Sequence, residues 1–201
     1  RRSSDLKVAE PMLFICTHSG RDQCCAVHGR ALLRSVHESL PPESRAAVWE
    51  CSHLGGHRFA PTALTLPHGA VWGRLDTQRA VDILAEASRG EIIPVDYRGR
   101  SAFPQPLQAA EAAVRTLIEE RAANSLDALW VRDDRAVPVR PGVAFDNLAQ
   151  LMTEVRHVDG QCWRVTVRHD PLPERKESCS GEPVPGHSWI VIAIDEQERW
   201  R

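Results

Sequence analysis

The sequence lacks the features of a membrane or secreted protein. None of its apolar runs approaches the roughly 20 consecutive residues that a membrane-spanning helix needs. The first ten residues, RRSSDLKVAE, have no apolar core of the kind found in a signal peptide. We therefore expect a cytoplasmic protein with no membrane association.

Strongly basic segments are also missing. The formal net charge is −2, and no run of lysines and arginines interleaved with aromatic residues occurs in the chain. Proteins that bind nucleic acid usually carry a basic patch or stripe. The sequence therefore argues against a nucleic-acid partner. Its 201 residues, of which 42% are hydrophobic, suffice for one domain or two small ones.

Cysteine and histidine are concentrated in one stretch of the chain. Residues 16–67 hold four of the six cysteines and five of the nine histidines. Two motifs stand out there, CTHSGRDQCC at residues 16–25 and SHLGGHRF at residues 52–59. Carboxylates are nearly absent from both motifs. Thiolates combined with imidazoles suit zinc, copper or an iron–sulfur cluster, whereas a hard cation would need carboxylates.

The spacing of these residues does not match common zinc motifs. Zinc fingers place their first two cysteines within a few residues, whereas Cys16 and Cys25 bracket a longer loop. The sequence Gly55-Gly56 between His53 and His57 argues against the helix of zinc proteases, and no glutamate follows His53. A binuclear iron cluster fits better, because each iron can take one ligand pair from its own loop. A structural Cys2His2 zinc site is the alternative.

The runs CTHSGRDQCCAVHGR and WECSHLGGHRFAPTALTLPHGAVWGRL resemble the sucrase/ferredoxin-like family, which includes the fungal actin-patch-distribution protein. The resemblance covers roughly residues 8–97. It implies a thioredoxin-like ferredoxin that holds a [2Fe-2S] cluster through two cysteines and two histidines, as a non-Rieske analogue of the Rieske site. The implied ligands are Cys16, Cys25, His53 and His57. It also favours Cys25 over the adjacent Cys24. The motifs have no nearby pair of carboxylates of the kind that a glycosidase uses, so the family name is no evidence of sugar chemistry.

The function expected from this resemblance is electron transfer rather than catalysis on a substrate of its own. A redox protein is then the partner, and a homodimer is left open. Histidine ligands would couple electron uptake to proton uptake, because an imidazole bound through one nitrogen keeps an ionisable N–H on the other. A sensor of redox or cluster status is the second hypothesis. A thiol oxidoreductase is disfavoured, because the chain has no C-x-x-C sequence and Cys24 and Cys25 are adjacent.

The pattern of apolar residues predicts an α/β protein, with a thioredoxin-like ferredoxin domain at residues 1–97. Strands are expected at residues 8–15, 46–51, 64–66 and 70–75, and helices at residues 24–39 and 77–88. Asp76 is a candidate cap for the second helix. The predicted order is that of thioredoxin.

A C-terminal extension, made of a helix and a small antiparallel sheet, is expected at residues 98–201. The predicted elements are a linker at residues 98–106, a helix at 107–123, a hairpin joining 155–158 to 161–169, and a strand at 189–194. The Pro/Glu-rich residues 171–185 are expected to form a long exposed loop. No second metal motif is visible in this half.

The remaining cysteines and histidines have simpler expected roles. Cys51 is expected to be a core thiol, and Cys162 and Cys179 to be one buried and one loop thiol. Four other histidines are expected at the surface or beside the site: His18, His28, His37 and His68. Three charged residues flank the proposed ligands and are expected to form solvated ion pairs: Arg21, Asp22 and Arg58.

Overall fold

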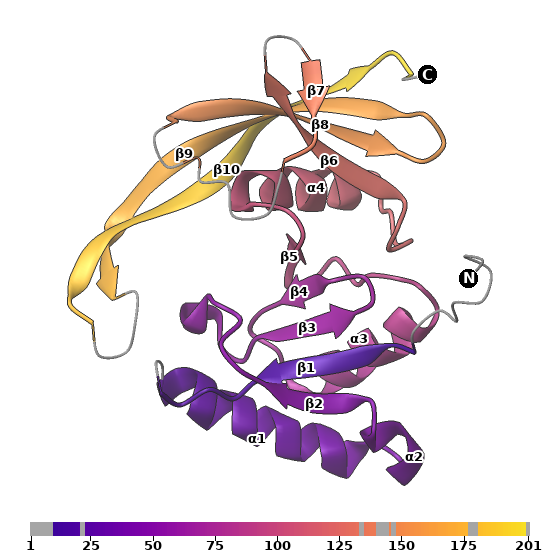
Figure 1. The fold of residues 1–201 in the computed structure, drawn as a ribbon, viewed down its shortest axis with the longest axis vertical. Coiled ribbons are helices and arrows are strands. Elements are labelled where there is room, and N and C mark those ends of the chain that lie inside the picture. Colours follow the sequence, from indigo (N-terminus) through magenta and orange to yellow (C-terminus); the bar gives the residue numbers. More distant parts are fainter. Residues whose placement is uncertain are drawn as a thin grey trace, which may run out of the picture.

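Two five-stranded sheets form the protein, and one helix lies between them (Figure 1). The computed structural model describes residues 10–20, 23–132, 135–139, 145, 148–176 and 181–199. The strand order is β2-β1-β3-β4-β5 in the first sheet and β10-β9-β8-β6-β7 in the second. None of the helices in the described part of the chain has the length and apolarity needed to span a bilayer.

The first sheet begins with a parallel β-α-β unit. Strand β1 (Met12–Cys16) pairs with β2 (Val48–Cys51) in parallel, and helix α1 (Gln23–Ser39) connects them, followed by the short helix α2 (Pro42–Arg45). The register places Cys16 opposite Cys51. Parallel strands end at the same edge of a sheet, so the residues that follow both strands are brought together there.

The rest of this unit is antiparallel. Strands β3 (Ala63–Leu66), β4 (Ala70–Trp72) and β5 (Tyr97–Arg100) extend the sheet beyond β1, and helix α3 (Thr77–Ser88) packs against α1. The carboxylate of Asp76 accepts a hydrogen bond from the Arg79 N–H at 2.7 Å, which confirms the predicted cap. This order of elements and strands is that of a thioredoxin-like fold. Buried residues of the core include Leu13, Ile15, Leu32, Val36 and Ile83.

The second unit is a helix covered by an antiparallel sheet. Helix α4 (Gln105–Leu117) packs against β6 (Leu126–Arg132), β8 (Gln150–His157), β9 (Cys162–Lys176) and β10 (Pro183–Gln197), and β7 (Arg135–Val137) forms the far edge. The core of this unit includes Leu107, Val114, Val155, Val165 and Val167. The predicted α/β class, with a helix and an antiparallel sheet after a thioredoxin-like unit, is confirmed.

Two predictions for the second half are wrong. Residues 98–106 are not a linker, because β5 belongs to the first sheet and α4 begins at Gln105. The first unit therefore extends past residue 97, where the sequence analysis placed the boundary. Glycine at position 99 allows this contact, since a Cβ there would lie 2.5 Å from the Cβ of Gln108 on α4.

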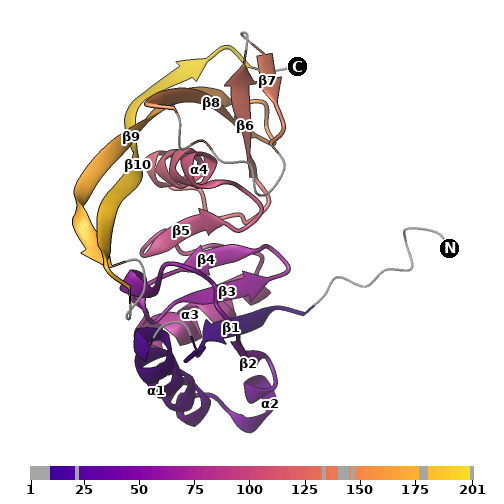
Figure 2. The ribbon, with the colours of Figure 1, turned by 60° about the vertical axis from the view of Figure 1, so that its left-hand side comes forward.

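The second error concerns residues 171–185, which the sequence analysis assigned to a loop. Strand β9 continues to Lys176 and β10 begins at Pro183, and the two strands pair along this region with a register shift between Val184 and Gly186 (Figure 2). This part of β9 can accommodate Pro171 and Pro173. The pairing of β8 with β9 ends at Arg168, so beyond that residue β9 pairs with β10 alone. Proline has no backbone N–H. On the unpaired side of a strand no hydrogen bond to a neighbouring strand is lost.

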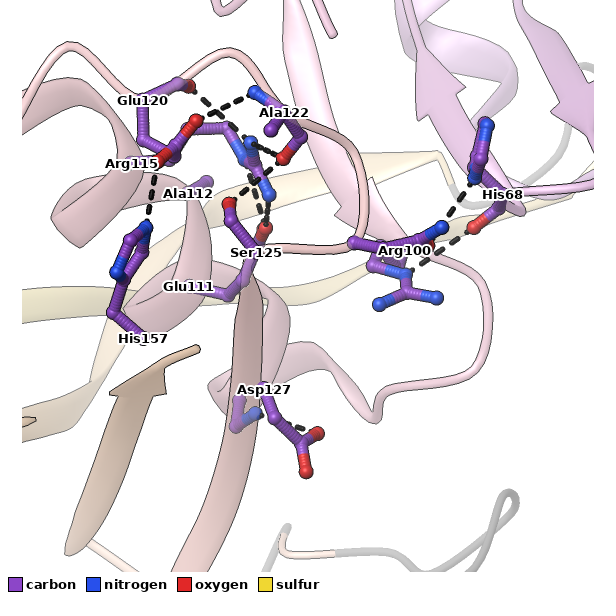
Figure 3. Close-up of polar contacts among 12 residues, drawn as sticks. His68, Arg100, Glu111, Ala112, Arg115, Glu120, Ala122, Ser125, Asp127 and His157 are labelled. Atoms are coloured by element: carbon purple, nitrogen blue, oxygen red, sulfur yellow. Dashed lines mark hydrogen bonds and ion pairs between the residues drawn. The ribbon is translucent and has the colours of Figure 1, made fainter. Parts of the chain in front are cut away.

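Backbone and side-chain contacts join the two units. Ile92 N–H donates to the Arg121 carbonyl at 2.7 Å, and Ala123 N–H donates to the Gly90 carbonyl at 2.8 Å. His68, in the loop between β3 and β4, pairs through Nδ1 with the Asn124 amide oxygen at 3.2 Å (Figure 3). His68 thus lies at the junction of the units.

Candidate metal centre

Cys16 and Cys25 both lie near the point where α1 crosses the end of β1. Cys16 is the last residue of β1 and is fully buried, and Cys25, in the first turn of α1, is 1% exposed. At Gly29, four residues after Cys25, a Cβ would lie 1.9 Å from the Cys16 carbonyl oxygen. Residues four apart share one helix face. The face of α1 that carries Cys25 therefore lies directly against the end of β1.

His53 and His57 lie on a loop that leaves the end of β2. Gly55 and Gly56 have φ values of 81° and 65°, a left-handed conformation that glycine adopts readily. The short 3-10 helix η2 (His57–Phe59) follows, and the Phe59 N–H donates to the Gly56 carbonyl at 2.8 Å. The sequence predicted a tight loop here rather than a regular helix, and the backbone confirms it.

The two motifs meet at two points. The Cys24 sulfur lies 3.4 Å from Nδ1 of His57, which joins the first turn of α1 to η2. The rings of His18 and His53 are 6.5 Å apart between centroids in an edge-on arrangement. Cys24 is half-buried and Cys25 is buried, so the two adjacent thiols face in different directions. The contact of Cys24 with His57 was not predicted, because sequence spacing does not show which of two neighbouring thiols faces the second motif.

Two other cysteines have the character of core thiols. Burial, with a smaller contribution from Cys16, raises the pKa of Cys51 to about 12. Burial, reinforced by the Glu154 carboxylate, raises the pKa of Cys162 to about 11. A raised pKa disfavours the thiolate, which is the form of cysteine that binds metal. Cys179, Arg21 and Asp22 lie outside the described residues.

The predicted donors are two thiols and two imidazoles. In the part of the chain that the structure describes, no three cysteine, histidine, aspartate or glutamate side chains converge to hold one metal ion. Cys16 ends β1, Cys25 lies in the first turn of α1, and His53 and His57 follow β2, so the predicted ligands lie toward one edge of the sheet. Soft thiolates and borderline imidazoles are donors suited to iron–sulfur chemistry or zinc.

Arginines beside the histidine loop are a further feature of this edge. Arg58, Arg74 and Arg98 all place their guanidinium groups over the ring of Phe59. The sequence singled out Arg58 alone, because it directly follows His57. Arg74 and Arg98 are distant in sequence, and no local pattern indicates that they approach the same ring.

Residues 3–99 match the model of the sucrase/ferredoxin-like family. The resemblance found in the cysteine and histidine motifs is confirmed over that range. Two fungal proteins named altered inheritance of mitochondria protein 32 are similar to the chain. The one from Meyerozyma guilliermondii is 33% identical over 101 residues, which cover 46% of this chain and 35% of the relative. The one from Candida glabrata is 29% identical over 100 residues, 43% of this chain and 31% of the relative. The chain thus matches about a third of each curated relative.

Solved structures with a similar arrangement include a thioredoxin-like [2Fe-2S] ferredoxin from Aquifex aeolicus. It is 17% identical, with a TM-score of 0.39, and the match covers 48% of this chain and 97% of that protein. A second structure of the wild-type ferredoxin has the same identity and a TM-score of 0.33, covering 41% of this chain and 89% of the other.

Proposed function

We propose that the chain binds a [2Fe-2S] cluster through Cys16, Cys25, His53 and His57 and passes single electrons to a partner protein. The observation that supports the proposal is the approach of α1 to the end of β1 at Gly29, in a region where Cys16 and Cys25 are both buried and the histidine loop leaves the neighbouring strand β2. The contact between Cys24 and His57 ties this loop to the same turn of α1.

The thiols and the fold around them have defined tasks in this proposal. Cys25 lies in the first turn of α1, where the positive end of the helix dipole favours an anionic sulfur. Burial of Cys16 and Cys25 excludes water from the sulfur ligands. The cluster, when bound, supplies one-electron redox chemistry, and two neutral imidazoles in place of two thiolates make reduction easier.

The histidines add a proton to this chemistry. An imidazole that binds through one ring nitrogen keeps an N–H on the other, and this proton is released more readily when the metal carries more positive charge. His53 and His57 are both half-buried, and one ring nitrogen of each, Nδ1 of His53 and Nε2 of His57, is buried. We infer that they take up a proton as the electron arrives and release it as the electron leaves.

A second candidate is a sensor of cluster status. The β9–β10 hairpin curves toward the first unit (Figures 1 and 2), and His187 and Trp189 of β10 line the same cavity as Arg58 and Phe59. A change in the histidine loop would therefore reach the hairpin directly. The cluster assignment is common to both candidates.

Iron and acid-labile sulfide content of the anaerobically purified protein tests the cluster assignment. We expect two irons and two sulfides per chain and a red-brown protein with visible charge-transfer bands. A colourless protein that contains stoichiometric zinc would contradict the proposal and support the zinc alternative.

Protein-film voltammetry across pH tests the proton coupling separately. The midpoint potential should fall as the pH rises over a range near or above neutrality. The double variant His53→Cys/His57→Cys should have a lower potential and little slope, because thiolates add negative charge and have no N–H to release. A flat wild-type potential from mildly acidic to strongly alkaline pH would refute proton coupling and leave the cluster assignment unaffected.

A further inference from the structure

Cys51 is a thiol that the proposed cluster does not use, and it lies directly opposite Cys16. Strands β1 and β2 run side by side in parallel (Figure 1), and their register pairs Cys16 with Cys51 at the end of both strands. The Thr17 N–H donates to the Cys51 carbonyl at 3.3 Å, which ties the two strand ends together. The relative position of the two cysteines is therefore set by the sheet itself.

The two side chains leave the sheet on the same face. Side chains alternate between the faces along a strand. Leu13 of β1 is paired with Val48 of β2, and both are buried in the core that faces α1 and α3. Cys16 and Cys51 each follow these residues by three positions, so both belong to the opposite face.

The backbone separation at this pair suits a disulfide. Neighbouring strands lie about 4.7–4.9 Å apart, and the Cα atoms of a disulfide are usually about 4.4–6.8 Å apart. Burial raises the pKa of Cys51 to about 12, and the charge of Cys16 adds to this shift, as expected of neighbouring thiols. Neither cysteine forms a disulfide in this structure.

We propose that hydrogen peroxide converts Cys16 and Cys51 into a disulfide when no cluster is bound to Cys16. Cys16 is fully buried and Cys51 is half-buried, so the oxidant must be nearly as small as a water molecule. The O–O bond of the peroxide breaks as one sulfur takes up a hydroxyl group to form a sulfenic acid, and water leaves. The other thiol displaces that hydroxyl group as a second water, and the S–S bond forms. The two sulfurs together lose two electrons, which the peroxide gains.

The disulfide would remove a proposed cluster ligand. This consequence rests on the proposed function, because it requires Cys16 to bind iron. The thiolate is the form of cysteine that binds metal, and a sulfur bonded to Cys51 cannot become one. The oxidised chain therefore takes up no new cluster until a thiol reductant opens the bond. Cys51 thus makes cluster assembly at this edge of the sheet sensitive to peroxide.

Cys25 is the competing partner for Cys16. It lies one turn before Gly29, the point at which α1 meets the Cys16 carbonyl. A peptide map separates the two possibilities, because cleavage after lysine and arginine places these cysteines in different peptides. Cys16 falls in residues 8–21, Cys25 with Cys24 in residues 22–30, and Cys51 in residues 46–58.

Peptide mapping of the full-length protein, as purified, tests the pair. Samples are treated with increasing hydrogen peroxide, blocked with N-ethylmaleimide, digested without reduction and analysed for iron in parallel. We expect residues 8–21 linked to residues 46–58 as the main cross-linked product, appearing as iron is lost and disappearing on reduction with dithiothreitol. Cys51→Ser should lack this product. Cys162→Ser, at another buried thiol, is the matched control and should form it as the wild type does.

The other results of this map would overturn the proposal. A main product that links residues 8–21 to residues 22–30 would show that Cys25 is the partner of Cys16. Residues 8–21 recovered without any cross-link at every peroxide concentration would show that the pair does not form. A protein without iron would refute the proposed function, while the map would still decide whether Cys16 and Cys51 form a disulfide.

A second measurement tests the link to cluster assembly. After oxidation, the wild type is supplied with ferrous iron and sulfide in the absence of a thiol reductant. It should regain several-fold less iron than Cys51→Ser treated in the same way, and dithiothreitol should bring the two proteins to the same level. Equal recovery without a reductant would overturn the link.

Discussion

The two units of the protein differ in where they place reactive side chains. In the first unit, Cys16, Cys25, His53 and His57 lie at the edge of the sheet where β1 and β2 both end. In the second unit, the described cysteine is Cys162, a buried thiol whose pKa is raised by its surroundings. The first unit thus provides the candidate metal centre, and the second provides one wall of the adjacent cavity.

The units also differ in how they are built. The first has a mixed sheet with α1 and α3 packed against each other, whereas the second has an antiparallel sheet wrapped around α4. Each has its own hydrophobic core, although Ala123, after α4, belongs to the core of the first unit. The proposed cluster site lies in the first unit, whereas contacts within and between both units contribute to stability.

The largest expected effect is loss of the cluster on replacing a thiol ligand. Cys16→Ser and Cys25→Ser should each remove the bound iron, because a serine hydroxyl replaces a thiolate poorly. Cys51→Ser and Cys162→Ser are matched controls, one in each unit, and should keep two irons per chain. The measurement is iron content after anaerobic purification.

Cys24→Ser decides between the two adjacent thiols. It should keep its iron, since the proposal assigns the ligand role to Cys25. If Cys24→Ser lost its iron and Cys25→Ser kept it, the ligand would be Cys24, the thiol that contacts His57.

The next effect is on stability and comes from removing the second unit. A chain that ends at Arg100 should keep the visible spectrum of the cluster but lose about 3 kcal/mol or more of unfolding free energy. It lacks α4, which covers β5, and the backbone hydrogen bonds that residues 121–123 make to residues 90–92. Thermal unfolding followed by visible absorption measures both quantities.

A chain that ends at Asn124 is the matched control for this truncation. It keeps α4 and residues 121–123, so it should recover most of the lost stability. A folded, soluble chain ending at Arg100 that holds no iron would contradict the comparison, because it would make the second unit necessary for cluster binding.

A buried ion pair in the second unit has a smaller predicted effect. Arg115 donates from Nη2 and Nε to a Glu111 carboxylate oxygen at 2.7 and 2.9 Å, and both side chains are fully buried (Figure 3). Arg115→Met should cost about 3–5 kcal/mol of unfolding free energy, because it leaves the Glu111 charge buried.

The double variant Glu111→Leu/Arg115→Met sharpens this test. Replacing both charges by apolar groups should recover much of the loss, since no uncompensated charge is left. Iron content should be the same in both variants. A loss of iron in Arg115→Met at temperatures where the protein is folded would show that the second core controls the candidate metal centre.

The smallest predicted effect is a pH-dependent contribution from His157. Its ring nitrogens contact Glu120 at 2.7 Å and Asp159 at 2.8 Å. Burial alone would lower the pKa of His157, but hydrogen bonds and charge from Asp159 and Glu120 outweigh it and raise the pKa. The stabilisation, about 1 kcal/mol, is therefore complete below the unfolded pKa of about 6.5 and is lost as the pH rises through the folded pKa.

Urea unfolding of the wild type and Glu120→Gln across this pH range measures the contribution. The stability difference between the two proteins should be largest at mildly acidic pH and shrink toward alkaline pH. A difference that grows with pH would contradict the assigned direction.

Local sequence signals predicted much of the first unit. The predicted bounds of α3 match because Asp76 caps its start, and α1 ends just before Pro41-Pro42, which cannot continue a helix. The histidine loop was predicted from Gly55-Gly56, whose positive φ values are a local property of glycine.

Predictions failed where neighbours in space determine the structure. Residues 171–185 look like a loop because of their prolines, but pairing with one neighbouring strand tolerates them. Strands β6 and β7 were missed, and Arg74 and Arg98 were not linked to Phe59, because these contacts join distant parts of the chain. The candidate ligands were proposed from the family resemblance of the two motifs, and this assignment stays a prediction.

The central claim is that two histidines and two cysteines hold one iron–sulfur cluster. Electron–nuclear double resonance on the reduced protein, produced with ¹⁵N-labelled histidine, tests it most directly. The account predicts strong couplings from two histidine nitrogens in the wild type and their absence in His53→Cys/His57→Cys. A reduced cluster that shows no histidine nitrogen coupling in the wild type would contradict the ligand assignment.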